Sequence, residues 1–332
     1  MIPEMVKVSI GTASVLGLAE CWLDEKPTTA YLMTYTEGGC IANCAFCPQA
    51  RESPSRKHML SRVLWPVFPT EKVLSGLRAP RDNVLERICI QVINYPGFLD
   101  TVLALLRAIK GVTELPVSLD TPPLKRAEME RLKEAGLDRI GLPMDAATPE
   151  LFDEVKGMLV GGPYRWERHM EALAEAVDVF GVGRVMSNLI VGLGETEKAA
   201  VAFIQRLTDM GVRTALFAFT PIPGTALAGQ PQPPLDAYRR IQLARHLITE
   251  GMARYRDMEF GEGGRLRDLG TDSESVRGVL QSGEAFRTSG CPGCNRPYYN
   301  ERPSGPLYNY PRGLSREEAL REAELIGLVE YE

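Results

Sequence analysis

Short apolar segments alternate with amphipathic segments along most of this chain, and this alternation limits the folds that it can adopt. Several of the apolar segments are almost continuous runs of Val, Ile, Leu and Phe, which is typical of strands covered on both faces in a parallel sheet. Eight segments are predicted to be strands: residues 29–35, 87–93, 116–120, 138–145, 184–192, 213–220, 254–260 and, more faintly, 284–289.

The segments between the predicted strands have the spacing of amphipathic helices. After Thr196, which can cap a first turn, apolar residues recur at helical spacing as far as Leu207, and Gly211 can end the helix in the left-handed conformation. Strand and helix alternate about eight times in roughly 260 residues, which is the size and rhythm of a TIM barrel. We therefore predict an α/β fold, a TIM-type (βα)8 barrel, with an open doubly wound sheet as the alternative.

The two ends of the chain depart from this alternation. Residues 1–27 are predicted to form an N-terminal arm, residues 28–290 the barrel and residues 291–332 a C-terminal extension. The extension opens with a loop rich in Pro, Tyr, Asn and Arg, and it ends in a charged helix. Its tyrosines either wall the mouth of the barrel or cover a site inside it.

Composition excludes several classes of protein. The 332 residues carry a net charge of −5 with both signs interleaved, so no basic stripe predicts a nucleic-acid partner. The N-terminal apolar run from Val8 to Ala19 is too short to span a membrane. Seven cysteines are an odd number in a chain too large to need disulfides. We expect a cytoplasmic protein whose cysteines serve a metal or catalysis.

Three cysteines, Cys40, Cys44 and Cys47, directly follow the first predicted strand. Thiolates are soft ligands that select zinc, copper or iron-sulfur clusters. Cys44 and Cys47 with Cys291 and Cys294 have the count of a four-ligand zinc site, which would make this a non-catalytic, zinc-stabilised protein. That interpretation leaves Cys40 unexplained, whereas three cysteines on one loop can hold three irons of a [4Fe-4S] cluster and leave the fourth open. Loops after the strands line the active face of a TIM barrel.

The stretch CIANCAFC resembles the CxxxCxΦC signature of the radical S-adenosylmethionine (SAM) superfamily. The resemblance implies that Cys40, Cys44 and Cys47 hold the cluster and that Phe46 lies against the adenine of SAM. In that family the open iron chelates the amino and carboxylate groups of SAM. The reduced cluster donates one electron, and a 5'-deoxyadenosyl radical then abstracts hydrogen from an unactivated carbon.

Two further stretches, within a resemblance that runs from about residue 28 to 260, extend the expected SAM site, and a third segment departs from the family pattern. GLPMDAATPELFDEV is similar to the biotin-synthase-type segment whose aspartate, here Asp145, binds the ribose hydroxyls; its alternative role is in a helix N-cap region. SNLIVGLGET implies that Ile190 and Val191 flank the adenine. QVINYPG stands where the family has GGE, and it assigns Asn94 to the methionine amino group.

The remaining cysteines suggest a second, auxiliary iron-sulfur cluster, expected to be [4Fe-4S]. Cys291 and Cys294 form a CxxC pair in a Pro-Gly turn, which is a ligand geometry. Cys89, on the second predicted strand, can reach into the barrel, and Cys21 in the arm is a possible further ligand. For both, the alternative is a small inert hydrophobe. Ser289 or a nearby hydroxyl is the candidate fourth ligand.

The triplet region and CPGCNRPYYNERP together look most like the two-protein lipoyl synthase of archaea and some bacteria, within the biotin synthase/lipoyl synthase-like enzymes. This resemblance implies a radical SAM sulfurtransferase that inserts sulfur into a protein-bound octanoyl chain, with the auxiliary cluster as sulfur donor. The implied partners are an octanoylated lipoyl carrier protein or peptide, a second radical SAM lipoyl synthase subunit, and an electron donor such as ferredoxin. Biotin synthase and a hydrogenase-maturase- or mutase-like enzyme are the alternatives.

Overall fold

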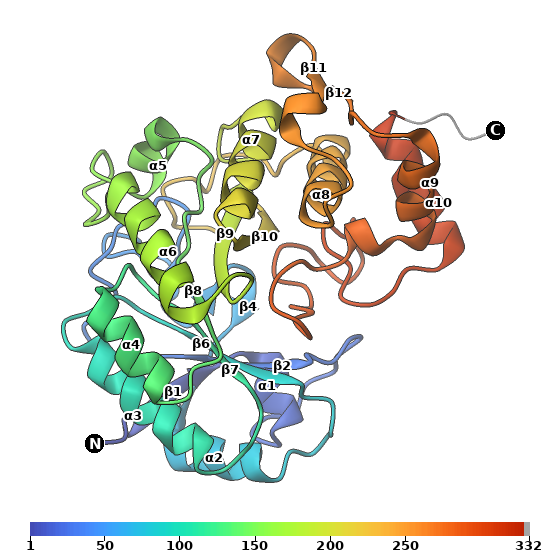
Figure 1. Cartoon of the computed structure of the whole chain (residues 1–332). Coiled ribbons are helices and arrows are strands. Elements are labelled where there is room, and N and C mark those ends of the chain that lie inside the picture. Colours follow the sequence, from blue (N-terminus) through green and yellow to red (C-terminus); the bar gives the residue numbers. More distant parts are fainter. Residues whose placement is uncertain (329–332) are drawn as a thin grey trace.

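The centre of the molecule is one eight-stranded sheet in the order β10-β9-β8-β7-β6-β2-β1-β5 (Figure 1). The computed structural model describes residues 1–328, so the last four residues of the predicted C-terminal extension lie outside the described part. β1 pairs antiparallel with β2, and β5 pairs antiparallel with β1. The six parallel strands are β2 (Thr29–Met33), β6 (Arg87–Gln91), β7 (Val117–Asp120), β8 (Arg139–Gly141), β9 (Val185–Val191) and β10 (Val212–Ala218), and the antiparallel strands are β1 (Met5–Val8) and β5 (Val67–Pro69).

Helices follow the parallel strands and surround the sheet (Figure 1). They are α3 (Phe98–Lys110), α4 (Arg126–Glu134), α5 (Pro149–Val155), α6 (Trp166–Phe180), α7 (Glu197–Asp209) and α8 (Leu235–Thr249). The other elements are α1 (Ile10–Val15), α2 (Thr70–Arg78), α9 (Ser273–Ser282), α10 (Arg316–Ile326) and the short strands β3 (Met59–Leu60), β4 (Val63–Leu64), β11 (Glu259–Phe260) and β12 (Leu266–Asp268). Within residues 1–328, no helix combines the length and apolar content that crossing a membrane requires.

The structure agrees with the predicted TIM-type α/β architecture, but two of the eight strands differ from those expected. Within residues 254–260 only β11 is a strand, and it pairs with β12 in a separate ribbon. Residues 284–286 form a 3-10 turn. The segment RYRDMEF carries charges at Arg254, Arg256 and Asp257, so it cannot be covered on both faces as a strand inside a parallel sheet must be. β1 and β5 complete the eight strands instead.

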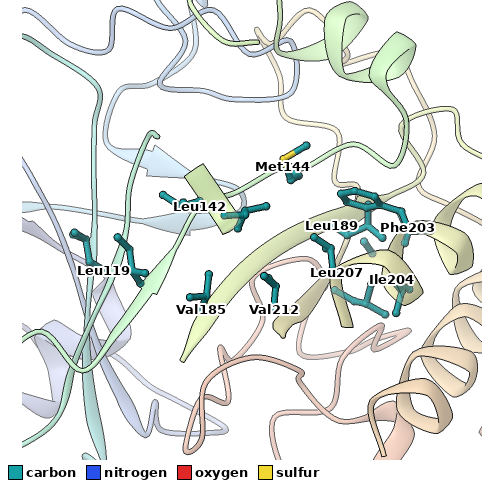
Figure 2. Close-up of a cluster of buried hydrophobic side chains, with 14 of the residues drawn as sticks. Leu119, Leu142, Met144, Val185, Leu189, Phe203, Ile204, Leu207 and Val212 are labelled. Carbon is teal, nitrogen blue, oxygen red and sulfur yellow. The ribbon is translucent and has the colours of Figure 1, made fainter. Parts of the chain in front are cut away.

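The helix expected after Thr196 forms as predicted. The Thr196 hydroxyl accepts a hydrogen bond from the Ala199 amide at 3.2 Å, and Gly211 follows the helix with φ of 80°. Figure 2 shows its buried face, with Phe203, Ile204 and Leu207 packed towards the sheet. Burying each such side chain stabilises the fold by about 1.5–3 kcal/mol. The strand ends that carry the polar residues of the site are therefore held in place by a well-packed core.

The C-terminal segment that follows α9 connects β10 to the start of β2. The Ser289 hydroxyl accepts a hydrogen bond from the Leu216 amide of β10 at 2.8 Å. Further along, the Gly293 carbonyl accepts one from the Thr28 hydroxyl at 2.6 Å, directly before β2, and the Asn295 side chain accepts one from the Thr28 amide at 3.0 Å. This segment therefore occupies a position where the predicted seventh and eighth strands were expected.

Candidate functional site

A cavity of about 280 Å³ lies inside the curved sheet. Six of the seven cysteines line it, in two groups. The first thiol group is Cys40, Cys44 and Cys47, from the loop after the carboxyl end of β2, and the second thiol group is Cys89 of β6 with Cys291 and Cys294 of the C-terminal segment. The structure thus brings the predicted ligands of both sites to one internal space.

The loop that carries the first thiol group is fixed through its backbone. The Ile41 amide donates to the Asn94 carbonyl, and the Ala45 amide donates to the Val155 carbonyl, each at 2.8 Å. Burial raises the pKa of Cys44 well above its ordinary value and raises the pKa of Cys47 to about 12. Without a cation these thiols hold their protons, so thiolate ligands at this place require the positive charge of a metal.

Asp145 also lines the cavity and is held by β9. Its amide donates to the Asn188 carbonyl and its carbonyl accepts from the Ile190 amide, both at 2.9 Å. Its φ of 66° is left-handed, a conformation that is uncommon outside glycine. The N-cap of α5 is Thr148, whose hydroxyl accepts from the Leu151 amide at 3.2 Å. Asp145 therefore does not cap the helix, and its carboxylate is directed to the cavity.

Lys156 is a site residue that the sequence analysis missed. Its Nζ donates to the Asp145 carboxylate at 2.6 Å and also to the Pro143 carbonyl, and it lies 5.2 Å from the centre of the Tyr164 ring. The Lys156 ammonium also counteracts part of the rise in the pKa of Cys44, whose largest cause is burial. Lys156 directly follows the short amphipathic helix α5, and this position alone does not distinguish it from a solvated lysine.

The other predicted SAM contacts divide between the cavity and the core. Phe46, Asn94 and Ile190 line the cavity, and the side-chain amide of Asn94 donates a hydrogen bond to the Tyr164 hydroxyl at 3.0 Å. Val191 does not line it, and its side chain is packed in the hydrophobic core. Successive side chains of a strand point to opposite faces, so Ile190 and Val191 cannot both flank one adenine. The prediction for Val191 was wrong for this reason.

The second thiol group surrounds the interior face of β6. Arg87, Cys89 and Gln91 alternate into the cavity, while Ile88 and Ile90 between them are fully buried in the core. The side-chain amide of Gln91 donates a hydrogen bond to Cys89 Sγ at 3.2 Å. Cys89 therefore faces the cavity, and it also packs against apolar side chains beside it.

The two cysteines of the C-terminal segment approach β6 and β2 from the amino ends of these strands. The Arg87 guanidinium donates to the Pro292 carbonyl at 3.2 Å, and the Tyr31 hydroxyl lies 3.3 Å from Cys294 Sγ. Burial, with the neighbouring Cys294 thiol, raises the pKa of Cys291 to about 11. The second thiol group consequently lies towards the opposite end of the cavity from the first.

Two predicted auxiliary ligands are placed elsewhere. Cys21 does not line the cavity, and its thiol donates to the Ile10 carbonyl at 3.7 Å in the N-terminal arm. Ser289 does not line it either, and its hydroxyl accepts the amide hydrogen of Leu216. The structure does not bring either residue to the second thiol group.

Polar side chains between the two thiol groups form a further set that sequence reasoning did not assign. Asp120 on β7 accepts a hydrogen bond from Gln91 at 3.0 Å, and burial raises the pKa of its carboxyl group. Gly141 provides the room for it, since a Cβ there would lie 1.9 Å from Asp120 Oδ1. The Arg296 guanidinium donates to the Ser289 carbonyl and stacks 3.9 Å from the centre of the Phe217 ring.

The donor arrangement distinguishes between the two metal hypotheses. Within the described residues, no three His, Cys, Asp or Glu side chains are grouped to hold a single metal ion. A structural zinc ion needs its four donors at about 2–2.3 Å from one point. In a [4Fe-4S] cluster each thiolate binds a different iron, so the sulfur atoms stand further apart. Cysteines of the described residues that do not converge on one point fit the cluster better than the zinc ion.

Comparisons with known proteins agree with this assignment. The family model described as the Radical SAM superfamily matches residues 35–207. The biotin synthase of Desulforudis audaxviator is 28% identical over 267 residues, covering 78% of this chain and 76% of that protein. The biotin synthase of Allorhizobium ampelinum is 29% identical over 235 residues, covering 68% and 67%.

Solved structures show the same fold. The FeFe-hydrogenase maturase HydG from Carboxydothermus hydrogenoformans has a TM-score of 0.51 at 20% identity, covering 67% of this chain and 51% of that one. Methylornithine synthase (PylB) has a TM-score of 0.51 at 14% identity, covering 66% and 62%. This chain therefore spans less than two thirds of either structure. At these identities the likeness concerns the fold alone.

Proposed function

Because this chain belongs to the radical SAM superfamily, we propose that it inserts sulfur into an unactivated carbon of an aliphatic substrate. The observation that supports this proposal is the presence of two thiol groups towards opposite ends of one cavity. One group suits the cluster that works with SAM, and the other suits an auxiliary cluster that serves as sulfur donor. A substrate carbon between them is within reach of both.

Each group of residues in the cavity would have a separate role. Cys40, Cys44 and Cys47 would hold the [4Fe-4S] cluster, which supplies one electron to SAM when both are bound. Asp145 would accept hydrogen bonds from the ribose hydroxyls, because a carboxylate accepts at both oxygens. Lys156 keeps this carboxylate in place, and the buried walls exclude water, which would otherwise react with intermediates.

The substrate that we propose is an octanoyl chain on a carrier-protein lysine. The triplet region and the CPGCNRPYYNERP segment, which resemble lipoyl synthase, support this choice. The apolar part of the lining, including Met33, Met186 and Phe217, suits an alkyl chain. The proposed partners remain the octanoylated carrier protein, a second lipoyl synthase subunit and an electron donor such as ferredoxin.

A second candidate function is biotin synthesis, because the curated relatives described above are named biotin synthase. Both reactions insert sulfur, and they differ in the substrate. A third possibility is a maturase- or mutase-like activity on the same fold, which needs no auxiliary sulfur donor.

Anaerobic turnover tests these candidates directly. The protein is reconstituted with isotopically labelled sulfide and incubated with a reductant and SAM, with either an octanoyl-lysyl peptide or dethiobiotin as substrate. The assay is run with and without a partner subunit. Mass spectrometry of the octanoyl peptide should reveal one or two labelled sulfur atoms. Cleavage of SAM without sulfur in either substrate would refute sulfur insertion, and sulfur only in dethiobiotin would establish the second candidate.

A further inference from the structure

A second cavity of about 290 Å³ adjoins the first. Its walls come from three parts of the chain: the N-terminal arm with Ile10 and Leu23, the β3–β4 hairpin with Leu64, and the C-terminal segment with Tyr298. The side chains of Tyr31 and Tyr299 line both cavities. These two side chains therefore form a wall between the second cavity and the space that holds the thiol groups.

The second cavity is lined mainly by apolar side chains, and it contains a carboxyl oxygen and a guanidinium group for which residues 1–328 offer no hydrogen-bond partner. Glu301 is only 4% exposed, yet its Oε2 has no hydrogen-bond partner among residues 1–328. The exposed Arg62 guanidinium, on the same lining, takes part in no hydrogen bond or ion pair within the described chain. An unpaired buried carboxyl oxygen costs about 1–3 kcal/mol, so it indicates a ligand that supplies a donor.

An acyl amide has the chemistry that matches this lining. Its N–H is a donor for Glu301, its carbonyl is an acceptor for Arg62, and its alkyl chain suits the apolar walls. A free fatty acid offers no N–H for the unpaired Glu301 oxygen. We propose that the second cavity binds the amide-linked end of an acyl-lysine substrate and that the alkyl chain reaches the thiol groups by passing Tyr299. This proposal rests on the proposed function and identifies its point of access.

The two tyrosines of the wall differ in how firmly they are held. The Tyr31 hydroxyl contacts Cys294 Sγ at 3.3 Å and accepts the Arg296 amide hydrogen at 2.9 Å. The Tyr299 hydroxyl is buried and has no partner among the described residues, although its carbonyl accepts from the Ser61 hydroxyl at 2.6 Å. Tyr299 can therefore turn its side chain aside without breaking a hydrogen bond, while its backbone stays fixed.

Binding to the anaerobically reconstituted protein tests the proposal. The probe is a fluorescent octanoyl-lysyl peptide, followed by anisotropy, with the same peptide lacking the acyl group and free octanoate as competitors. We expect both competitors to displace it at least tenfold less well than the unlabelled octanoyl peptide. Glu301→Gln, which keeps an acceptor oxygen, should preserve this preference, and Glu301→Leu should abolish it.

A matched pair of surface variants keeps the proposal testable if Glu301→Leu does not fold. Leu64 on the cavity wall is 42% exposed, and Leu325 on α10, which does not line the cavity, is 43% exposed. Leu64→Glu should weaken binding of the octanoyl peptide at least tenfold, and Leu325→Glu should leave it unchanged. Equal binding by these two variants, or equal competition by octanoate, would overturn the proposal.

The outcomes also separate this proposal from the proposed function. Tight, Leu64-dependent binding of the peptide without any sulfur transfer would refute sulfur insertion and leave the binding site intact. Sulfur transfer that Leu64→Glu does not slow would refute the second cavity as the point of access and leave the reaction standing.

Discussion

Replacing Lys156 by methionine removes a buried positive charge and keeps most of the apolar stem. Its ammonium lies 2.6 Å from the Asp145 carboxylate, and the two side chains are only 6% and 11% exposed. Removing one partner of a buried pair leaves the other charge uncompensated, which typically costs about 3–5 kcal/mol. We therefore expect Lys156→Met to lower the free energy of unfolding by about 3 kcal/mol or more.

A double-mutant cycle isolates the pair itself. Asp145→Asn alone leaves a buried ammonium, whereas Asp145→Asn combined with Lys156→Met leaves two neutral side chains. The double variant should therefore be more stable than the sum of the single effects predicts, by about 1–3 kcal/mol. Urea unfolding of each protein, measured under anaerobic reducing conditions, gives the four free energies.

The exposed ion pair between Arg254 and Asp209 provides the control. Its atoms are 2.8 Å apart, but its side chains are 52% and 51% exposed. Such pairs contribute about 0–1 kcal/mol, so Arg254→Met should change the free energy of unfolding very little. If Lys156→Met costs no more than Arg254→Met, burial does not decide the strength of this pair, and the account of how Asp145 is held for the ribose is wrong.

Three further expectations concern the thiol groups and Glu301. Cys44→Ala should remove about four irons per chain and abolish SAM cleavage without changing the far-ultraviolet circular dichroism; retention of that iron would contradict the assignment of the first cluster. Cys291→Ala should also remove about four irons but leave SAM cleavage intact, as measured by 5'-deoxyadenosine release; a simultaneous loss of cleavage would contradict two separate sites. Burial raises the pKa of Glu301 from 4.5 to about 8 in the folded protein, so the unfolded chain binds fewer protons between these values and stability should fall as the pH rises through this range. Glu301→Gln should flatten this part of the stability curve in urea unfolding at a series of pH values, and an unchanged slope would assign it to other groups.

Much of the fold could be predicted because its central strands are recognisable locally. The runs at residues 87–93 and 184–192 are nearly continuous in apolar residues, and both became parallel strands, β6 and β9. The edges of the sheet could not be predicted in this way. β1 has four residues and β5 has three, and both became strands through pairing with β2 and with each other. Such pairing depends on tertiary contacts that a short segment does not reveal.

The candidate site, like the fold, could be predicted only where the information is local in the sequence. The first thiol group was predictable because its three cysteines share one loop, so their spacing carries the information. The assignment of Val191 failed because the stretch SNLIVGLGET does not indicate which of two adjacent side chains faces inward. Lys156 contacts Asp145 and Pro143 in the loop before its own helix, and Arg296 contacts Phe217 of the distant strand β10; nothing in their local sequence identifies either residue.

The position of the second thiol group follows from how the sheet is completed. Only six strands are parallel, and the C-terminal segment that bears Cys291 and Cys294 occupies the interior between β10 and the start of β2. Hydrogen bonds at Ser289, at the Gly293 carbonyl and at Asn295 fix this segment without a thiol, and Cys294 Sγ adds a contact of 3.3 Å with the Tyr31 hydroxyl. The two cysteines thus lie on a segment that backbone and side-chain contacts anchor to β2 and β10, and this anchoring directs them to the interior beside Cys89.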